Sequence, residues 1–279
     1  MRPVSKAERV FAERAELPKQ IEPNEAAFCT AQKINGTIVS ATILRHDIYF
    51  FVADKTDLIQ KEHFEGRFYE SDELEIISKF FHPGGTFVDI GANVGNHTVY
   101  VARFLSPLNV IVIEPNPSTF AIIKANIALN QLGGCVDVSH LGIGLSNTSA
   151  RAVAMTPAGN LGGTRLEFSE HGSLRVVPGD AILSGHRIDF LTIDVEGMEV
   201  DVLDGLKKTI AEQRPRIFIE VDNCNVAKFF EWTKINNYSI VASGSGRTVW
   251  SVSPSTPGYE NFMLIPDGAR GCADGGRTQ

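Results

Sequence analysis

The order of apolar and polar residues predicts alternating strands and helices from residue 86 onward. Short, almost wholly apolar runs are typical of strands buried on both faces; they are TFVDI, NVIVIE, CVDVS, RIDFLTIDV and RIFIEV. The segments between them carry apolar residues at helical spacing, as in residues 199–213, and Asn116 and Pro117 predict one helix start, as N-cap and first residue. The alternation predicts an α/β fold with a mainly parallel sheet that helices cover on both faces.

The chain before this alternation predicts a hairpin and one helix. Residues 37–54 are β-branched and aromatic around a polar Arg-His-Asp centre, which favours a β-hairpin. The next helix is predicted over residues 71–81, with Ser71 as its N-cap. Residues 1–36 are polar and interrupted by three prolines, so we interpret them as an N-terminal arm.

Two later regions do not follow the alternation. About forty residues, from Ser146 to His186, interrupt it, and loops of this length are usually functional or disordered. Near the end of the chain, the apolar runs YSIVAS, TVWSV and FMLIP predict an antiparallel edge of the sheet. The glycine-rich residues 267–279 predict a disordered tail.

Composition and charge narrow the class of protein. The chain of 279 residues is 43% apolar, which suits one large globular α/β domain. Its net charge of −7 and the lack of a basic cluster argue against nucleic acid as a partner. No apolar stretch approaches the roughly 20 residues that span a bilayer, and the N-terminus has no apolar core of a secretory signal. With four scattered cysteines and no C-x-x-C pair, these features favour a cytoplasmic protein with reduced thiols.

Candidate ligand-binding residues lie at the ends of the predicted strands. In an open α/β sheet, ligands bind beyond the carboxyl ends of the strands, where the strand order reverses. The first strand ends at Asp89, the second at Glu114 and the fourth at Asp194. If the first and fourth strands flank the reversal, Asp89 and Asp194 face one crevice. Glu114 lies 23 residues after Gly91, where Rossmann-type folds place the acid that binds ribose hydroxyls. The pattern therefore predicts an adenosine-containing cofactor.

The loop FVDIGANVGN, residues 87–96, discriminates between such cofactors. A dinucleotide site has the pattern G-x-G-x-x-G and places a pyrophosphate at the start of the next helix, where a carboxylate is unfavourable. Here Asp89 immediately precedes the turn, and Asn93 stands in place of the middle glycine. A ligand with an ammonium and a sulfonium group is attracted to such a carboxylate. The loop therefore favours S-adenosylmethionine (SAM) over a nicotinamide dinucleotide.

These residues also have interpretations without a ligand. Gly91 and Gly95 can form a tight turn between strand and helix, and Glu114 can be a solvated acid at a strand end. Asp194 and Glu196 can cap the helix that follows them, because acids are favourable at that end.

The sequence predicts no metal site built wholly from protein ligands. The seven histidines show no spacing typical of zinc ligands, and His97 is interpreted as part of the local structure. Mg²⁺ needs only one or two carboxylates, so the sequence leaves open a Mg²⁺ site at Asp194, Glu196 or Glu220. Glu220 can equally pair with a neighbouring Lys or Arg.

Three segments together resemble the FkbM-type SAM-dependent methyltransferases; they are FVDIGANVGNHTVYVA, VIVIEPNPSTFAIIKANIALN and IDFLTIDVEGMEVDVLDGL. RFYESDEL and GNLGG also fit this pattern, and the resemblance covers residues 68–221 together with NFMLIP. D-I-G-A-N-x-G occurs widely among class I methyltransferases, whereas its combination with I-D-V-E-G is highly specific. The resemblance implies a seven-stranded, Rossmann-like class I methyltransferase fold and the methylation of hydroxyls on sugars and natural products.

The resemblance also implies roles for individual residues. The loop residues expected at the methionine end of SAM are Asp89, Gly91, Ala92, Asn93, Gly95 and Asn96. Glu114 would bind the ribose hydroxyls, Asn116 or Pro115 would lie beside the adenine, and the turn from His140 to Gly142 would close over the ring.

The acceptor is expected beside Asp194, with Glu196 as the second candidate. Either carboxylate would remove the proton of the acceptor hydroxyl or orient that hydroxyl. Many amine methyltransferases carry an N/D-P-P-Y/F motif at this position, and its replacement by Asp-Val-Glu-Gly favours an oxygen acceptor.

The sequence therefore predicts a SAM-dependent methyltransferase that acts on a hydroxyl of a saccharide or of a glycosylated natural product. A nicotinamide-dependent oxidoreductase and a non-catalytic SAM-binding subunit are the alternatives. The expected domains are an arm and hairpin over residues 1–66, a methyltransferase domain over 67–266 and the tail over 267–279. Tyr49, Phe50 and Phe51 are consecutive in the hairpin, so at least one faces away from the others. Core packing is the preferred interpretation of these aromatic residues, with a homodimer interface or a wall of the acceptor site as the alternatives.

Overall fold

The computed structural model describes residues 34–243 and 258–268. The predicted arm, the run TVWSV and residues 269–279 of the predicted tail lie outside these residues.

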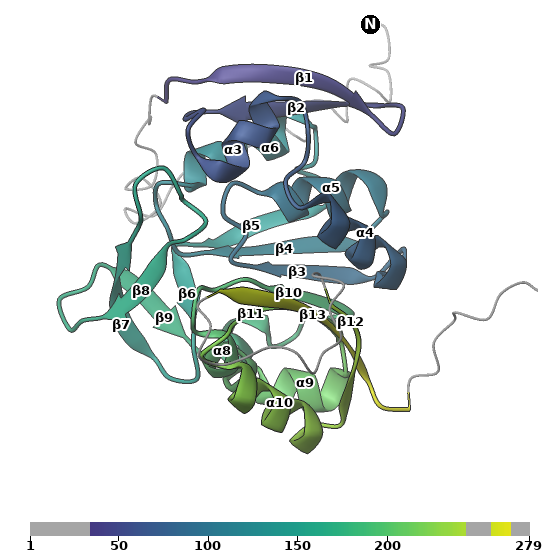
Figure 1. The fold of residues 1–279 in the computed structure, drawn as a ribbon, viewed down its shortest axis with the longest axis vertical. Coiled ribbons are helices and arrows are strands. Elements are labelled where there is room, and N and C mark those ends of the chain that lie inside the picture. Colours follow the sequence, from purple (N-terminus) through teal and green to yellow (C-terminus); the bar gives the residue numbers. More distant parts are fainter. Residues whose placement is uncertain (1–33, 244–257, 269–279) are drawn as a thin grey trace, which may run out of the picture. The chain divides into compact units, whose positions relative to one another are not determined.

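The central sheet has seven strands in the order β12-β13-β11-β10-β3-β4-β5 (Figure 1). Its five parallel strands are β3 (Thr86–Ile90), β4 (Asn109–Glu114), β5 (Val136–Leu141), β10 (Phe190–Ile193) and β11 (Arg216–Asp222). β13 (Tyr259–Pro266) runs antiparallel between β11 and β12 (Tyr238–Ser243). The five predicted strands, the two described runs of the antiparallel edge and the seven-stranded Rossmann-like fold are thereby confirmed, although β5, at one end of the sheet, is only partly buried.

Helices cover both faces of this sheet (Figure 1). On one face they are α4 (Ser71–Phe80), α5 (Asn96–Phe104) and α6 (Phe120–Leu129); on the other they are α8 (Glu199–Gly205), α9 (Lys207–Gln213) and α10 (Val226–Ile235). Alternate residues of β4 point to opposite faces: Val110 and Val112 pack in the core under α4 to α6, whereas Ile111 and Ile113 pack in the core under α8 to α10. Within the described residues, no helix is long and apolar enough to cross a membrane.

Two predicted helix starts were wrong. Ser71 is the first residue of α4, and Glu70 is the N-cap, in a left-handed conformation without a side-chain capping bond. α6 begins at Phe120 and not at Pro117. Asn116 instead forms a turn of its own, because its side-chain oxygen accepts a hydrogen bond from the backbone N–H two residues later.

The helix predicted over residues 199–213 is divided into α8 and α9. The division falls after Gly205, where the chain passes so close to Ser146 that a Cβ would lie 2.1 Å from the Ser146 carbonyl oxygen. The helical spacing of the apolar residues persists across this break, so the pattern alone did not reveal it.

The hairpin docks on α6 through two asparagines. Its elements are β1 (Thr37–Ile43) and β2 (His46–Val52), and α3 (Leu58–Phe64) follows them. The Asn130 amide exchanges hydrogen bonds of 3.0 and 2.7 Å with the backbone N–H and C=O of Tyr49, and Asn126 accepts from the N–H of Phe51 at 2.7 Å. Phe50 is buried in the core, while Tyr49 faces the surface. These side chains give the second edge of β2 the hydrogen bonds that a neighbouring strand would otherwise supply.

The interruption from Ser146 to His186 is ordered, which corrects the interpretation of this region as a long loop. It contains β7 (Ala150–Met155), β8 (Arg165–Phe168), β9 (Leu174–Val177) and α7 (Gly179–Leu183). Together with β6 (Ile143–Leu145), the strands form a separate sheet in the order β6-β9-β7-β8. This small sheet lies at the end of the central sheet where β6 continues from β5 (Figure 1).

Candidate active site

The strand order reverses at β3. The predicted first and fourth strands, β3 and β10, therefore lie side by side, which is the condition for a shared crevice at their ends. The chain continues from β3 to β4 on one side and returns later to β10 on the other. The end of β10 closely approaches the loop after β3: the N–H of Asp194 donates to Ile90 O at 2.9 Å. A Cβ on Gly91 would lie only 1.7 Å from Asp194 O, and Gly91 has φ +86°, so only glycine fits here.

One cavity lies over the ends of β3 and β4 and is called here the apolar cavity. Its volume is about 40 Å³. Its apolar lining residues are Ile90, Ile113, Pro115, Ile143, Leu145, Leu161, Leu166, Val195 and Met198. Glu114, Asn93 and Asp194 supply polar groups to the same wall.

Glu114 is fully enclosed at the end of β4. One carboxylate oxygen accepts from the N–H of Asn93 at 2.8 Å and the other from the N–H of Asn116 at 2.6 Å. Burial raises the pKa of Glu114 to about 7, although these two hydrogen bonds oppose the rise, and the charge of Asp89 adds to it. Glu114 is therefore a rigidly held acid whose charge is sensitive to pH near neutrality.

Asn93 lies where two cavities meet. Its backbone is left-handed, with φ +50°, a conformation that asparagine tolerates better than most residues. The residue is 9% exposed, and within the described part of the chain neither its side-chain nitrogen nor its oxygen has a hydrogen-bond partner. A buried amide without partners is costly, so such a group at a cavity wall indicates a polar ligand.

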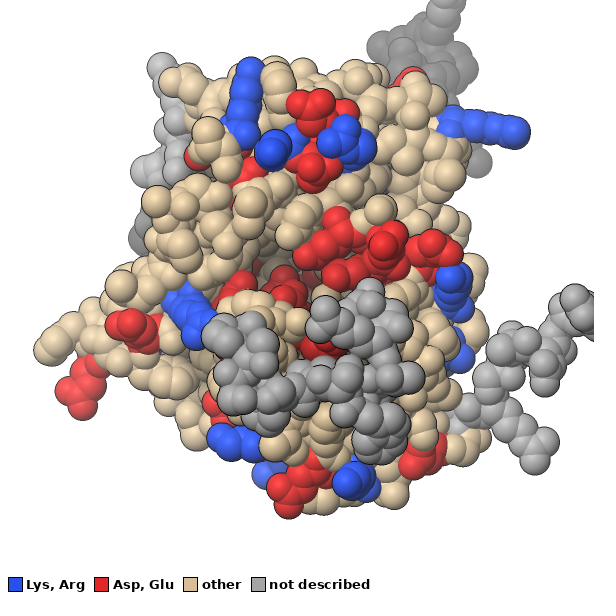
Figure 2. Space-filling model, viewed as in Figure 1, with Lys and Arg blue, Asp and Glu red and all other residues tan. Residues whose placement is uncertain are grey.

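The second cavity, called here the acidic cavity, lies beyond Asn93 over the ends of β10 and β11. Its volume is about 190 Å³. Its polar lining residues are Tyr69, Glu70, Asn93, Asn96, His97, Asn160, Asp194, Glu196, Glu220 and Tyr259, with no Lys or Arg among the described residues that line it. Figure 2 shows acidic side chains gathered around a hollow on this face. Gly91, Asn93, Gly162, Asp194 and Glu196 line both cavities, which therefore adjoin.

The carboxylates of the acidic cavity raise one another's pKa. The pKa of Asp194 lies well above its usual value, because the group is buried and because Glu220 and Glu70 carry like charges nearby. Burial, followed by the charge of Glu70, raises the pKa of Glu220 to about 8. Burial and the charge of Glu73 raise the pKa of Glu70 to about 8. Strongly perturbed acids in a cleft are a physical mark of a functional site.

The loop over residues 156–164, called here the roof loop, covers the two cavities. Hydrogen bonds hold it on both sides. The N–H of Leu161 donates to Asp57 at 2.8 Å, and the Asn116 amide donates to Thr164 at 3.0 Å. Within the loop, the N–H of Gly163 donates to Asn160 at 3.0 Å. These hydrogen bonds hold the glycine-rich segment over the site.

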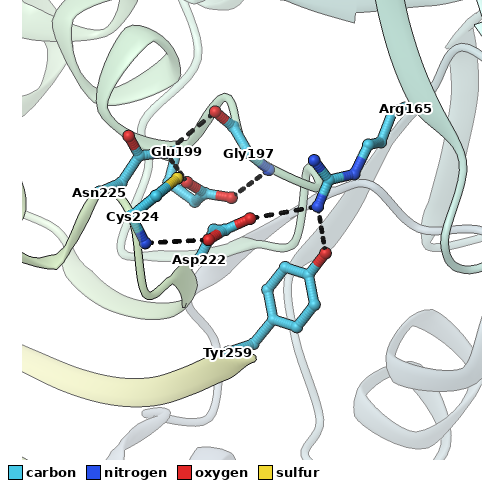
Figure 3. A network of polar contacts seen from close by, with 7 residues as sticks. All are labelled: Arg165, Gly197, Glu199, Asp222, Cys224, Asn225 and Tyr259. Atoms are coloured by element: carbon cyan, nitrogen blue, oxygen red, sulfur yellow. Dashed lines mark hydrogen bonds and ion pairs between the residues drawn. The ribbon is translucent and has the colours of Figure 1, made fainter. Parts of the chain in front are cut away.

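Arg165 connects the small sheet to the central sheet at the rim of the acidic cavity (Figure 3). Its guanidinium donates to Asp222 at 3.1 Å and to the hydroxyl of Tyr259 at 2.6 Å. Asp222 ends β11 and Tyr259 begins β13, so this one side chain joins the inserted sheet to two strand ends. Since Tyr259 lines the acidic cavity, Arg165 fixes part of its wall.

The sequence of residues 89–240 matches the model of the methyltransferase FkbM domain, which is more than half of the chain. The chain belongs to the FkbM methyltransferase family. It is accordingly a SAM-dependent methyltransferase, as predicted, and the nicotinamide-dependent alternative is set aside.

Two curated methyltransferases are similar to this FkbM-family protein. Methyltransferase 1 of Beauveria bassiana is 25% identical over 180 residues, which are 54% of this chain and 68% of that protein. Methyltransferase sdnD of Sordaria araneosa is 27% identical over 205 residues, which are 60% of this chain and 74% of that protein.

Solved methyltransferase structures are more distant. The tRNA methyltransferase TrmK of B. subtilis aligns with a TM-score of 0.43 at 14% identity, over 70% of this chain and 65% of that chain. TrmK of M. capricolum in complex with S-adenosyl-homocysteine aligns with a TM-score of 0.42 at 14% identity, over 70% and 67%.

In this FkbM-family methyltransferase, several predicted site residues line the cavities directly, namely Gly91, Ala92, Asn93, Asn96, Glu114, Asp194 and Glu196. Asp89 does not line either cavity, contrary to the expectation that it faces the crevice with Asp194. Its carboxylate accepts hydrogen bonds from Thr98 at 2.5 Å and from Thr192, its partner on β10, at 3.0 Å. Asp89 is therefore enclosed between β3, β10 and α5.

Three other predicted residues are occupied with structural contacts. Gly95 is the N-cap of α5, where a Cβ would lie 2.8 Å from Ile123. The Asn96 amide exchanges hydrogen bonds of 3.0 and 2.9 Å with the backbone of Tyr69. Asn116 holds the turn before α6 and the roof loop.

The wall predicted around Gly142 lies slightly further along the chain. Gly142 forms the junction between β5 and β6, and Ile143 to Leu145 line the apolar cavity instead. Asp194 and Glu196 do not cap the next helix, since the N-cap of α8 is Met198 and no side chain makes a capping bond there.

Sequence reasoning missed Glu70, Tyr69 and Tyr259 as residues of the site. Glu70 and Tyr69 lie in RFYESDEL, a segment that fits the family pattern, but acids at a helix start are common without any ligand. Tyr259 lies in the last strand, about 170 residues beyond the glycine loop, and only the antiparallel return of β13 brings it to the site.

Proposed function

We propose that this methyltransferase transfers the methyl group of SAM to a hydroxyl of a saccharide or of a glycosylated natural product. The observation that carries the proposal is the position of Asp194, which lines both adjoining cavities at the end of β10. A carboxylate at that junction is next to a cofactor in the first cavity and an acceptor in the second.

The residues present fit SAM. When bound, SAM supplies a methyl group on a positively charged sulfur. In our proposal the apolar cavity takes the adenosine, with Pro115, Ile143 and Leu145 against the adenine and Glu114 accepting from the ribose hydroxyls. The unpartnered amide of Asn93 then contacts the methionine end, and the nearby acids attract its ammonium group.

The remaining predicted cofactor residues act through the shape and charge of the site. We assign Asp89 an electrostatic role from beneath the loop, because its carboxylate is held by two threonine hydroxyls. Gly91, Ala92 and Gly95 shape the loop, and Asn96 holds it to Tyr69. Asn116 and Gly142 position the wall of the apolar cavity.

Asp194 is the proposed proton acceptor for the acceptor hydroxyl, and Glu196 orients that hydroxyl. A sugar hydroxyl is a weak acid, so a carboxylate whose pKa is raised accepts its proton more readily than an ordinary one. The raised pKa of Asp194, caused by burial and by Glu220 and Glu70, suits this task once the group is ionised. The protein otherwise contributes alignment of the attacking oxygen with the methyl group.

The charges of the acidic cavity favour an uncharged or cationic acceptor. The described residues that line it include Glu70, Asp194, Glu196 and Glu220 and neither Lys nor Arg. An acceptor with a phosphate or carboxylate near the methylated hydroxyl would meet like charges there. A neutral polyhydroxyl compound can instead donate hydrogen bonds to these groups.

The proposal is tested by incubating the protein with SAM and a panel of neutral saccharides, glycosylated natural products and matched amines. We expect mass spectrometry to detect methylated products on oxygen, and titration calorimetry to detect binding of SAM. Methylation restricted to the amines would refute oxygen as the acceptor atom.

A further inference from the structure

A small void opens beside the acidic cavity, between the ends of β10 and β11 and the starts of α4 and α5. Its volume is about 10 Å³, which admits a single water-sized atom. The side chains around it that carry donor atoms for a metal are Glu70, Glu73, His97, Asp194, Glu220 and Asn261. Glu70, His97, Asp194 and Glu220 line the acidic cavity as well.

The ligand atoms of three of these residues are close enough to share one ion, and two of the residues, Glu70 and Glu73, also hydrogen-bond to each other. Glu70, Glu73 and His97 each offer one ligand atom, and these atoms lie within 4.8 Å of one another. His97 Nε2 lies 3.9 Å from Glu70 Oε2, too far for a hydrogen bond. An ion bound at about 2.0 to 2.3 Å from each ligand keeps the ligand atoms roughly 3 to 4.5 Å apart.

Unpartnered atoms point to the same ligand. Within the described residues, His97 Nε2 and Asn261 Oδ1 are buried and have no hydrogen-bond partner, and both residues line the void. Such groups are costly to bury unless a ligand satisfies them.

The acids of the void are not explained by helix capping. α4 carries Asp72 and Glu73 in its first turn, and Glu70 makes no side-chain capping bond. Glu73 accepts a hydrogen bond from Asn261 Nδ2 at 2.5 Å, an arrangement that also orients a metal-binding carboxylate. The exposed Asp72 is sufficient to interact with the helix dipole.

We infer that Glu70, Glu73 and His97 bind one divalent metal ion. Two carboxylates with an imidazole suit a first-row transition ion such as Mn²⁺ better than Mg²⁺, which prefers oxygen ligands alone. The site differs from the Mg²⁺ site that the sequence left open at Asp194, Glu196 or Glu220. Among the described residues, the group with spacing for one ion is Glu70, Glu73 and His97.

The ion lies at the wall of the acidic cavity, because Glu70 and His97 line both spaces. If the proposed function holds, an acceptor hydroxyl in that cavity can approach the ion. Coordination lowers the pKa of a hydroxyl, so the ion assists Asp194 in removing the proton. The binding of the metal itself does not depend on that function.

The test is a titration of the chelator-treated, tag-free full chain with Mn²⁺ alone, followed by electron paramagnetic resonance. We expect one saturable Mn²⁺ per chain and a rise in melting temperature on binding. The variants Glu70→Gln and His97→Gln should bind Mn²⁺ at least about tenfold more weakly. Asp72→Asn, at an exposed acid in the first turn of α4, is the matched control and should bind as the native chain does.

Circular dichroism and melting curves without metal show whether each variant is folded, and the two variants, one before α4 and one in α5, provide independent tests. The absence of saturable Mn²⁺ binding by the native chain would overturn the inference. Equal binding by the native chain and by both folded variants would overturn it too. A parallel calorimetric titration with SAM separates this result from the proposed function, since loss of SAM binding contradicts that function and leaves the metal measurement standing.

Discussion

The apolar and acidic cavities adjoin, yet they are built on opposite principles. The apolar cavity encloses one carboxylate, Glu114, and the backbone N–H groups of Asn93 and Asn116 satisfy both of its oxygens. The acidic cavity collects four carboxylates, and none of the described residues that line it is Lys or Arg. In our proposal the first cavity holds the adenosine of SAM, whereas the second gathers acids around the acceptor.

The difference shows where this protein gives up stability for function. Buried acids without counter-charges are unfavourable for folding. The pKa values of Glu70 and Glu220, each raised to about 8 by burial first, reflect this cost. Left-handed backbone at Glu70 and Glu196, φ +56° and +50°, adds strain in the same place. Sites that violate folding preferences in this way are the expected location of catalysis.

The largest expected effect comes from Asp194→Asn, which removes the proposed proton acceptor from the junction of the cavities. We expect kcat to fall by about 10²- to 10⁴-fold, with a much smaller change in the Kd for SAM, because Glu114 and the apolar residues of the wall are intact. Steady-state kinetics and calorimetry measure the two quantities. Asp204→Asn, at an exposed acid of α8, is the control. Full turnover by Asp194→Asn would remove this residue from the mechanism.

Gly91→Ala should disrupt both cavities together, since Gly91 lies in the wall that they share. Its Cβ would lie 1.7 Å from Asp194 O at a φ of +86°, so we expect the free energy of unfolding to fall by more than about 3 kcal/mol. Gly84→Ala is the control, because Gly84 has φ +80° with no atom within 4 Å. Its cost should be only about 1 to 2 kcal/mol. Denaturant unfolding measures both, and equal losses would contradict the close approach.

Glu114→Gln should affect the apolar cavity alone. Replacing the carboxylate weakens its hydrogen bonds to the ribose hydroxyls, at a cost of about 2 kcal/mol, or roughly 30-fold in the Kd for SAM. The KM for the acceptor should not change, because the acidic cavity is intact. Calorimetry with SAM checks the first expectation, with Glu167→Gln on the exposed strand β8 as control. Unchanged SAM affinity would place the ribose elsewhere.

The pH dependence of SAM binding is a second test of the proposed contact between Glu114 and the ribose hydroxyls. Since burial raises the pKa of Glu114 to about 7, and the ionised form is the better acceptor for ribose hydroxyls, the Kd should be about tenfold weaker at pH 6 than at pH 8. Calorimetry across this range should show the dependence in the native chain and a flatter curve in Glu114→Gln. A native curve that is equally flat would contradict the assignment.

Ionisation of Glu114 has opposite effects on SAM binding and on stability. The folded pKa of Glu114 exceeds the usual value of 4.5, so the folded state binds more protons than the unfolded chain between these values. The contribution of Glu114 to stability is therefore present below pH 4.5 and is lost as the pH rises through about 7. Unfolding measurements on the native chain and on Glu114→Gln isolate this contribution.

The smallest effect is expected from replacing Arg165, at the rim of the acidic cavity. Arg165 is about half exposed in its ion pair with Asp222, so Arg165→Met should cost less than about 1 kcal/mol of stability. Because Arg165 fixes Tyr259, the KM for the acceptor should rise by roughly threefold, with the Kd for SAM unchanged. Arg175→Met, at an exposed position of β9, is the control. A larger effect on SAM than on the acceptor would assign Arg165 to the other cavity.

The sequence predicted the central sheet well because buried strands carry their signal in consecutive apolar residues. β3, β4 and β11 lie where the pattern placed them. The small sheet was missed for the opposite reason: the strand Arg165–Phe168 is largely exposed, and its alternation of charged and apolar residues extends over only four residues, which is too short to distinguish it from a loop. The start of α6 was displaced because a turn at Asn116 uses the same residue types as a helix cap.

The residues of the candidate site also differed in how far the sequence alone could predict them. Strand ends and the glycine loop located Glu114, Asn93 and Asp194, because these features are local in the sequence. The direction of Asp89 was not predictable from the motif, since it depends on the pairing of Asp89 with Thr192 on β10. The contribution of Glu70 and Tyr259 needed the tertiary fold, which brings α4 and β13 to the ends of β10 and β11.

The central claim is that adenosine occupies the apolar cavity and that the acceptor occupies the acidic one. The most direct measurement is a crystal structure with S-adenosylhomocysteine bound. The account predicts the adenine between Pro115, Ile143 and Leu145, the ribose hydroxyls on Glu114, and the sulfur directed toward Asp194. Adenosine bound in the acidic cavity, or a ribose turned away from Glu114, would contradict it.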